Sequence, residues 1–371
     1  MTIIFDDTIT GHHLEYISYY HELAKRNREE RFCFLLPVEF CKAKDAIRWT
    51  EEPNITVSYI SESDRERCKK GNIFVSAWNK ARLVARESKK LNADRVFLTT
   101  LMEIMPFLLF LLPDRCVLSG IIYRIYLRDN EMRGVRLWLE KLRFFLMARI
   151  HDKSVFYVLN DENSVCKLNE EYNTTKFVFL PDPVPNIDVS NIQDIRSELG
   201  ISEEKYIYLH FGGLTERKGT LEILKAILDT DAETLSDRCF IFAGKIYDDI
   251  KDKFYELYEK ARQKADILVF DEYCRYAFLY NLCKTCDCIL MPYKMTNLSS
   301  GILGYAAFFN KPVIAPEQGL IGDIVRGNFL GVTLKDVSAR GISAAFKLSP
   351  VCRLNNYAVR NSVDSFINTL A

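Results

Sequence analysis

The sequence predicts an α/β protein with two Rossmann-like domains, and three observations lead to this prediction. Its 371 residues fit two domains of roughly 100–200 residues each. Short apolar runs alternate with longer amphipathic segments along the whole chain, which is the pattern of a parallel sheet covered by helices. Three prolines within Pro181–Pro185 interrupt this alternation, because proline cannot continue a helix or a central strand. We therefore expect domains over residues 1–185 and 186–355, followed by a C-terminal segment, 356–371.

In the first half, helices are expected where apolar residues recur at helical spacing, as at Leu14, Ile17, Tyr20 and Leu23. The expected helices are 14–28, 73–91 and 105–112. Strands are expected at the short apolar runs 2–5, 32–36, 55–59, 96–99, 117–122, 155–159 and 176–180.

The second half repeats the alternation with a new set of short apolar runs. Strands are expected over residues 206–211, 239–243, 267–270, 288–291 and 312–315, with helices between them. Each half therefore carries enough strands for a doubly wound sheet of its own.

Composition excludes several classes of protein. Fifty Lys and Arg balance 50 Asp and Glu, so no net charge recruits a polyanion, and we expect no nucleic-acid partner. Eleven cysteines without regular spacing favour a reducing compartment. The start of the sequence lacks a basic segment followed by an apolar one, so we expect no secretory signal and a cytoplasmic location. The most apolar run, 105–112, is too short to span a bilayer.

The cysteines at 283, 286 and 288 are the only ones close together in sequence. Their spacing superficially resembles half of a metal site, but no second Cys or His cluster completes four ligands. They lie at the end of an expected helix and in an expected buried strand, so we interpret them as small core residues. No metal site is predicted.

The first motif with chemical potential is the turn Gly212-Gly213, where an expected strand passes into a helix. Glycines at such a turn let backbone N–H groups approach an anion, and the N-terminus of the helix adds partial positive charge. Arg217 and Lys218 would complete a diphosphate site. The alternative from spacing alone is an ordinary turn with two solvated basic residues.

A second motif, 291–304, again joins a strand end to an apolar helix through a polar turn. Ser299, Ser300 and Gly301 would begin that helix with free N–H groups, although a simple helix cap explains the same residues. Both turns would lie at the carboxyl ends of strands in one domain, where open α/β sheets bind ligands.

Taken together, these segments resemble the family 4 retaining glycosyltransferases of the GT-B fold, whose two Rossmann-like domains face a central cleft. The resemblance covers about 120 residues of the second half, and its motifs occur in the family's order. The matching segments are 212–219, 241–245, 279–292, 310–315 and 319–325. The resemblance also implies that a final helix, from about Asn355 to Leu370, packs back on the first domain.

The sequence departs from the family pattern at its donor site. Members carry two glutamates separated by seven residues, and the aligned positions here are Asn297 and Tyr305. The arginine that holds the donor is replaced by Gly213, so Arg217 is our candidate to supply the missing guanidinium. Tyr273 follows the strand after which relatives bind the nucleobase, where it would stack on a base or form a surface turn. A catalytically inactive nucleotide-sugar-binding protein is the alternative that these losses leave open.

The first domain fits the family more loosely, and it is expected to face the acceptor. Gly11, His12 and His13 follow the first strand, where these enzymes carry a glycine loop. Tyr123 and Arg124 occupy the region where many members have a histidine near the reacting sugar, so the role of that histidine is not carried over. Arg128 is a further acceptor-side candidate. Residues 124–153 carry eight basic and four acidic side chains interleaved with aromatic ones, which fits an anionic membrane surface or a solvated helix face.

The resemblance implies sugar transfer with retention, from a nucleotide-sugar co-substrate to a glycan or lipid-linked acceptor, with no cofactor. Such chemistry would serve cell-surface polysaccharide biosynthesis at the inner face of the membrane. An NAD-dependent oxidoreductase is disfavoured because G-x-G-x-x-G is absent after the first strand. Lys218, Arg217 and Arg124 are the expected catalytic residues. The expected donor-binding residues are Gly212, Gly213, Lys218, Tyr273, Asn297, Ser299, Ser300, Gly301 and Tyr305.

Overall fold

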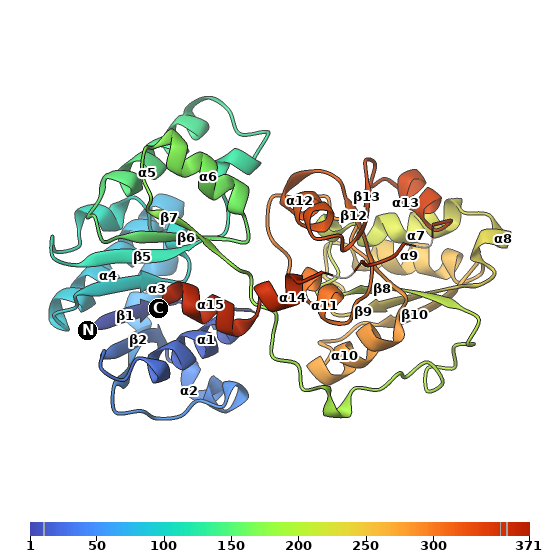
Figure 1. Cartoon of the computed structure of the whole chain (residues 1–371), viewed down its shortest axis with the longest axis horizontal. Coiled ribbons are helices and arrows are strands. Elements are labelled where there is room, and N and C mark those ends of the chain that lie inside the picture. Colours follow the sequence, from blue (N-terminus) through green and yellow to red (C-terminus); the bar gives the residue numbers. More distant parts are fainter. Residues whose placement is uncertain (10–11, 349, 354) are drawn as a thin grey trace. The chain divides into compact units, whose positions relative to one another are not determined.

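The computed structural model describes residues 1–9, 12–348, 350–353 and 355–371, and these form two compact units (Figure 1). Unit 1 comprises Met1–Pro181 and Val363–Ala371, and unit 2 comprises Asp182–Ser362. We expected the chain to pass between its domains at 185 and 355. It leaves unit 1 after Pro181 and returns to it at Val363.

Unit 1 contains a parallel seven-stranded sheet in the order β3-β2-β1-β4-β5-β6-β7. Alternate residues of each strand face opposite sides, so Ile3 and Phe5 pack on one face while Ile4 packs on the other. The strands are β1 (Thr2–Phe5), β2 (Phe32–Pro37), β3 (Ile55–Ile60), β4 (Arg95–Leu98), β5 (Val117–Ile122), β6 (Val155–Leu159) and β7 (Phe177–Leu180).

Helices cover both faces of this sheet. One face packs against α1 (His12–Arg26), α2 (Phe40–Ala43) and α15 (Val363–Leu370). The opposite face packs against α3 (Glu62–Lys69), α4 (Ile73–Lys90), α5 (Gly134–Arg149) and α6 (Glu162–Glu171). Short 3-10 turns fill the connections: η1 (Lys44–Ile47), η2 (Leu101–Glu103), η3 (Phe107–Phe110) and η4 (Tyr126–Arg128).

Unit 2 contains a parallel six-stranded sheet in the order β10-β9-β8-β11-β12-β13, the strand order of a Rossmann fold. The strands are β8 (Tyr206–Phe211), β9 (Arg238–Ala243), β10 (Asp266–Phe270), β11 (Cys288–Leu290), β12 (Val313–Pro316) and β13 (Gly331–Leu334). The helices are α7 (Thr220–Asp229), α8 (Ala232–Leu235), α9 (Lys251–Ala261), α10 (Tyr276–Thr285), α11 (Ile302–Phe308), α12 (Gly319–Gly327), α13 (Ala339–Ala345) and α14 (Tyr357–Arg360), with 3-10 turns η5 (Val189–Asn191) and η6 (Glu216–Lys218).

The prediction of two Rossmann-like α/β domains is confirmed, and all twelve expected strands are present. Two local expectations were wrong, and one strand was not foreseen. Residues 105–112 contain the 3-10 turn η3 rather than a helix, because Pro113 disfavours helical geometry at Leu112 and leaves an apolar run of only a few residues, too short for a stable helix. The edge strand β13 was not expected, since it is short and only half buried. The expected final helix is divided into α14 and α15 around Asn361 and Ser362.

The C-terminal helix α15 belongs to unit 1 and packs on α1. The ring of Phe366 lies edge-on to the ring of Tyr16, with 5.3 Å between centroids. At the surface, Arg26 of α1 donates to the Asp364 carboxylate at 2.7 Å. The last residues of the chain therefore complete the core of the first unit, although they follow unit 2 in sequence.

Candidate functional site

The candidate site lies where the strand order of unit 2 reverses. Strands β8 and β11 are neighbours there, and the chain leaves them in opposite directions around the sheet. Residues 212–219 follow β8 and residues 291–301 follow β11, so both motifs identified in the sequence stand at one sheet edge. Open α/β sheets bind their ligands at such a switch point.

Glycine is required at both ends of the first loop. Gly212 has φ +89° and Gly219 has φ +71°, values that side chains rarely adopt. A Cβ atom at Gly219 would lie only 2.1 Å from the carbonyl oxygen of Pro292 in the second loop. The two loops can therefore approach this closely only because residue 219 is glycine.

Lys218 is the central side chain of this site. It is 9% exposed, its Nζ lies 3.5 Å from the carbonyl oxygen of Phe211, and it stands 5.6 Å from the centre of the Tyr293 ring. No carboxylate among the described residues lies within ion-pair distance of it. A buried ammonium is costly without a negative partner, so this position is suited to an anionic ligand.

The other cations around these loops differ in their pairing. Lys294 pairs with Glu222 at 2.9 Å, and Lys245 and Lys251 both pair with Asp271. Arg217 is exposed and, like Lys218, has no carboxylate partner within the described part of the chain. Among these cations, Lys218 and Arg217, the two residues predicted from the first motif, are therefore the ones whose positive charge is available to a ligand.

The pKa of Asp271 reflects its ion pairs with Lys245 and Lys251. Partial burial alone would raise the pKa of Asp271. The backbone N–H of Ile246 and the ammonium groups of Lys251 and Lys245 outweigh burial and lower that pKa to about 2. This carboxylate stays ionised at neutral pH and holds the loop after β9 to the end of β10.

The second loop is held by its own hydroxyl groups. Ser299 Oγ donates to the Asp182 carboxylate at 2.6 Å, and Ser300 Oγ lies 3.5 Å from Tyr293 Oη. Tyr293 in turn faces Lys218, so the structure brings Lys218, Tyr293 and Ser300 together. Gly301 immediately precedes α11, with open space where a Cβ would lie.

The two positions that the sequence resemblance aligns with glutamates, Asn297 and Tyr305, have different environments. Asn297 Oδ1 is buried and has no hydrogen-bond partner among the described residues, so it can accept a bond from a ligand. Tyr305 is buried, and its ring packs edge-on against Phe211 with 5.7 Å between centroids. Tyr305 thus contributes to the core beneath the site.

Two tyrosines of this site were not predicted. Tyr247 follows β9, and its ring would lie 3.1 Å from a Cβ at Gly213, so it covers this glycine of the first loop. Tyr293 is the second, as described above. By contrast, the predicted Tyr273 is 82% exposed after β10. The sequence gives no signal for Tyr247, since its contact with Gly213 joins loops that are distant along the chain.

His210 connects three elements beneath the first loop. It lies in β8, its Nδ1 donates to the Leu290 carbonyl of β11 at 2.9 Å, and its Nε2 lies 3.0 Å from Thr220 Oγ1 at the start of α7. Complete burial, assisted by the charge of Lys218, lowers the pKa of His210 to about 4, against the opposing effect of the bond to Leu290. The imidazole is therefore neutral at pH 7.

This burial predicts acid sensitivity. Because the pKa of His210 is about 4 in the folded protein and 6.5 in the unfolded chain, its contribution to stability is complete above pH 6.5 and is lost as the pH falls towards 4. The difference corresponds to about 3 kcal/mol. We expect His210→Gln to flatten the dependence of the free energy of unfolding on pH between 6.5 and 4, measured by urea denaturation. The exposed His151→Gln is the control, and an unchanged slope in His210→Gln would contradict the assignment.

In unit 1, the corresponding sheet edge carries a buried acid and a histidine. Asp6 follows β1 and is completely buried, and its Oδ2 lies 2.9 Å from Nδ1 of His13 in α1. Burial alone would lower the pKa of His13, but the bond to Asp6 and the nearby carboxylates raise it. Of the other candidates in this loop, Gly11 and the side chain of His12 lie outside the described residues.

The two acceptor-side arginines have unequal roles in the fold. Arg124 is half exposed and pairs with Asp129 at 2.6 Å. Arg128 makes two bonds to the buried Asp161 carboxylate, at 2.8 and 2.7 Å. Burial alone would raise the pKa of Asp161, but Arg128 and Ser164 outweigh it and lower that pKa.

We expect Arg128→Ala to destabilise the protein by about 3 kcal/mol, because it leaves the buried Asp161 carboxylate without its partner. Arg124→Ala breaks an exposed pair and should cost less than about 1 kcal/mol. Urea denaturation of both variants measures the difference. Equal, small losses would instead mean that Arg128 is free to contact an acceptor without structural cost.

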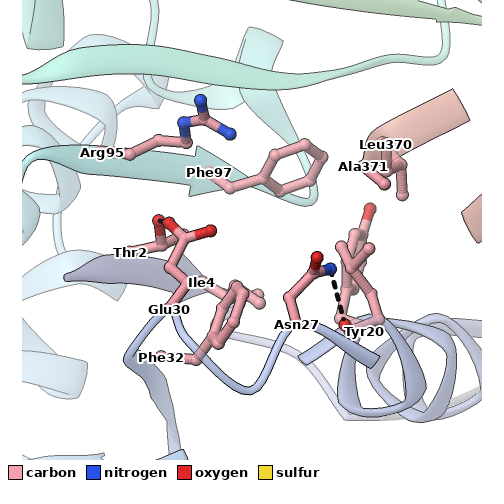
Figure 2. A pocket seen from close by; sticks show the side chains of 11 residues that line it. Thr2, Ile4, Tyr20, Asn27, Glu30, Phe32, Arg95, Phe97, Leu370 and Ala371 are labelled. Carbon is pink, nitrogen blue, oxygen red and sulfur yellow. Dashed lines mark hydrogen bonds between the residues drawn. The ribbon is translucent and has the colours of Figure 1, made fainter. Parts of the chain in front are cut away.

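A separate hollow lies at the opposite, amino-terminal edge of the unit 1 sheet (Figure 2). The buried hydroxyl of Tyr20 lines it and has no hydrogen-bond partner in the described part of the protein, and Glu30 and Arg95 also contribute. Burial raises the pKa of Tyr20 well above its usual value. This hollow is remote from the carboxyl ends of the strands, and we assign it no ligand.

The described ranges contain neither a cluster of metal-binding side chains nor a helix able to span a membrane. No group of three or more His, Cys, Asp or Glu side chains there is arranged to hold a metal ion. Cys283, Cys286 and Cys288 are buried free thiols, as expected for core residues. Within the same ranges, every helix is too short or too polar to cross a bilayer.

Comparison with known proteins identifies the fold. No protein-family model matches this sequence, and no curated protein matches it. Solved structures match the whole chain. WaaG, a glycosyltransferase involved in lipopolysaccharide biosynthesis, matches with a TM-score of 0.63, 13% identity and coverage of 100% of this chain and 94% of WaaG. Anabaena HepE in complex with UDP and glucose matches with a TM-score of 0.67, 16% identity and coverage of 100% and 98%. A glycosyltransferase from Rickettsia africae matches with a TM-score of 0.65, 14% identity and coverage of 100% and 92%. This chain therefore has the GT-B fold, with two Rossmann-like α/β domains.

Proposed function

We propose that this protein is a retaining glycosyltransferase that transfers a sugar from a nucleotide-sugar donor to a glycan or lipid-linked acceptor. The observation that carries the proposal is the buried Lys218, which has no carboxylate partner in the described structure and stands between two loops at the switch point of unit 2. The fold supports the same conclusion, since HepE was solved in complexes with UDP and with UDP-glucose.

The proposed donor site follows from the placement of these groups. Lys218 and Arg217 would hold the diphosphate, together with the backbone at Gly212 and Gly213 and the hydroxyl of Ser300. Asn297 offers its unpaired oxygen to a sugar hydroxyl, and Ser299 holds the loop in place through Asp182. Gly301 leaves room for the donor beside the loop. Tyr305 supports the site from the core, where it packs against Phe211 at the end of β8. Tyr273 is the candidate to stack on the base.

In the proposed reaction, an acceptor hydroxyl attacks the anomeric carbon from the face that the diphosphate leaves. The bond between that carbon and the phosphate oxygen breaks, and its electron pair passes to the diphosphate, which also takes the hydroxyl proton. Lys218 and Arg217 stabilise the negative charge that develops, and fixed cations in a water-poor site do this most effectively. These groups perform the role that a metal ion performs elsewhere, so we propose metal-independent transfer without a cofactor.

On the acceptor side, we propose that His13 and Arg124 contact the attacking substrate or its phosphate, with Asp6 positioning His13. Arg128 would contribute through its support of Asp161. The basic, aromatic stretch 124–153 is proposed to lie near an anionic membrane surface, which places the protein peripherally on the inner, cytoplasmic face. Cell-surface polysaccharide biosynthesis is the process that such an arrangement serves.

Turnover of a donor panel tests this proposal. The full chain is incubated with UDP-sugars and GDP-sugars and a lipid-linked acceptor, with and without EDTA, and release of the nucleoside diphosphate is measured. We expect release with one nucleotide class, insensitivity to EDTA, and retained anomeric configuration by proton NMR of the product. Binding without release from any donor would instead identify a non-catalytic nucleotide-sugar-binding protein.

A further inference from the structure

The turn between α3 and α4 exposes large apolar side chains at the start of a long helix. Ile73 is 84% exposed, Phe74 66%, and Val75 and Trp78 at least 40% each. In the second half of the same helix, Leu83 and Val84 are buried in the core of unit 1. The first two turns of α4 therefore carry apolar surface that the fold itself does not use.

Hydrogen bonds hold this exposed turn in a defined shape. Asn72 caps α4 by accepting from the Val75 backbone at 3.0 Å. Ser76 Oγ donates to the Cys68 carbonyl at 2.6 Å, and Asn79 donates to the Arg67 carbonyl at 2.8 Å. The apolar side chains are thus presented on a braced helical hairpin, whose end over residues 67–78 we call the α3–α4 tip.

The tip is also basic. Residues 67–78 contain Arg67, Lys69 and Lys70 and no acidic side chain. None of these three cations has a carboxylate within ion-pair distance among the residues that the structure describes. Apolar side chains with an adjoining cluster of unpaired cations are the combination that binds the interface of an anionic bilayer.

The exposed apolar surface continues onto neighbouring elements of unit 1. Phe107 of η3 packs edge-on against Trp78 with 5.6 Å between ring centroids, and Phe110 of the same turn is 69% exposed. Helix α5 adjoins the chain just before η3, because the Arg143 guanidinium of α5 donates a hydrogen bond to the Met102 carbonyl. Helix α5 adds its own exposed stripe of Val135, Trp138, Leu139, Leu142 and Phe145.

We propose that the α3–α4 tip docks unit 1 on an anionic lipid surface, with Ile73 and Phe74 inserted among the lipids and Lys69 and Lys70 at the headgroups. Trp78 would lie at headgroup level, where indole rings are enriched. A lipid surface fits better than a second copy of this chain, because self-association through the tip would bring like charges together. This docking rests on the peripheral membrane location proposed above and names a surface that would carry it. It needs neither donor nor turnover, so docking and sugar transfer can fail separately.

Vesicle flotation of the full chain tests the proposal. We expect flotation with vesicles of phosphatidylcholine and phosphatidylglycerol at 7:3, and much less with phosphatidylcholine alone. Lys69→Ala/Lys70→Ala should weaken partitioning to the anionic vesicles by about 30-fold. Ile73→Ser/Phe74→Ser should weaken it by more than about tenfold, because two apolar side chains no longer leave water.

Matched variants separate docking from general effects on the surface. Lys89→Ala/Lys90→Ala removes two exposed lysines from the other end of α4, and Val189→Ser/Val351→Ser removes two exposed apolar side chains of unit 2. Both should float like the wild type, and all variants should unfold at the wild-type temperature. Absence of flotation, equal flotation of the tip variants and the wild type, or self-association through the tip would each overturn the proposal.

Discussion

Replacement of Lys218 by alanine is expected to lower donor turnover by about 10²–10³-fold. Lys218 is the buried cation closest to the first glycine turn, and loss of one preorganised charge contact to a leaving group has effects of this size. The kcat of donor cleavage, measured as release of nucleoside diphosphate at saturating donor, gives the effect directly.

The same substitution should leave the fold intact. In the unliganded protein, Lys218 pays the desolvation cost of burial without a carboxylate partner in the described structure, so its removal should maintain or raise the melting temperature. Lys225→Ala is the matched control, because Lys225 lies in α7 seven residues later and pairs with Glu222 at 3.6 Å. Turnover by Lys218→Ala at the level of Lys225→Ala would contradict the role of Lys218.

The second large effect is expected for Gly219→Ala, which should destabilise the protein by about 4 kcal/mol or more. The new methyl group would lie 2.1 Å from the Pro292 carbonyl oxygen, and φ +71° would itself be strained for alanine. Relief of the overlap requires the two loops to separate. Urea denaturation should therefore show a lower midpoint, and nucleotide affinity should fall with it.

Gly327→Ala is the control for this substitution. Gly327 ends α12, has an ordinary φ, and has open space around the position of a Cβ. Alanine there should be neutral or stabilising, since glycine is a poor helix residue. If Gly219→Ala proved as stable as Gly327→Ala, the close approach of the two loops would be wrong.

The strands of both sheets could be predicted from the sequence because buried parallel strands are nearly continuous apolar runs. Tyr206–Phe211 and Val117–Ile122 are such runs, and both form strands with the predicted bounds. The edge strand β13 escaped prediction because Gly331–Leu334 is half exposed and carries a weaker apolar signal. The helix expected over residues 105–112 was wrong because the apolar run does not show how short the segment is before Pro113. Its conformation depends instead on the packing of Leu108 into the core of unit 1.

The candidate site was predictable only where a motif lies within one turn. Gly212, Gly219 and Lys218 share one loop, so their proximity follows from sequence spacing. The approach of Tyr293 to Lys218 and of Tyr247 to Gly213 depends on which strands are neighbours, which spacing alone does not show. Arg128 was predicted to contact an acceptor, but it donates two hydrogen bonds to the Asp161 carboxylate, 33 residues away in sequence. Sequence spacing does not show that pairing.

The central claim is that unit 2 binds the diphosphate of a nucleotide through Lys218. Thermal unfolding of the wild type and Lys218→Ala with UDP, GDP and their sugars tests it most directly. A nucleotide at 100 times its dissociation constant should stabilise the wild type by about 2.7 kcal/mol, and Lys218→Ala should lose this gain. No stabilisation by any nucleotide, or the same stabilisation in Lys218→Ala, would contradict the claim.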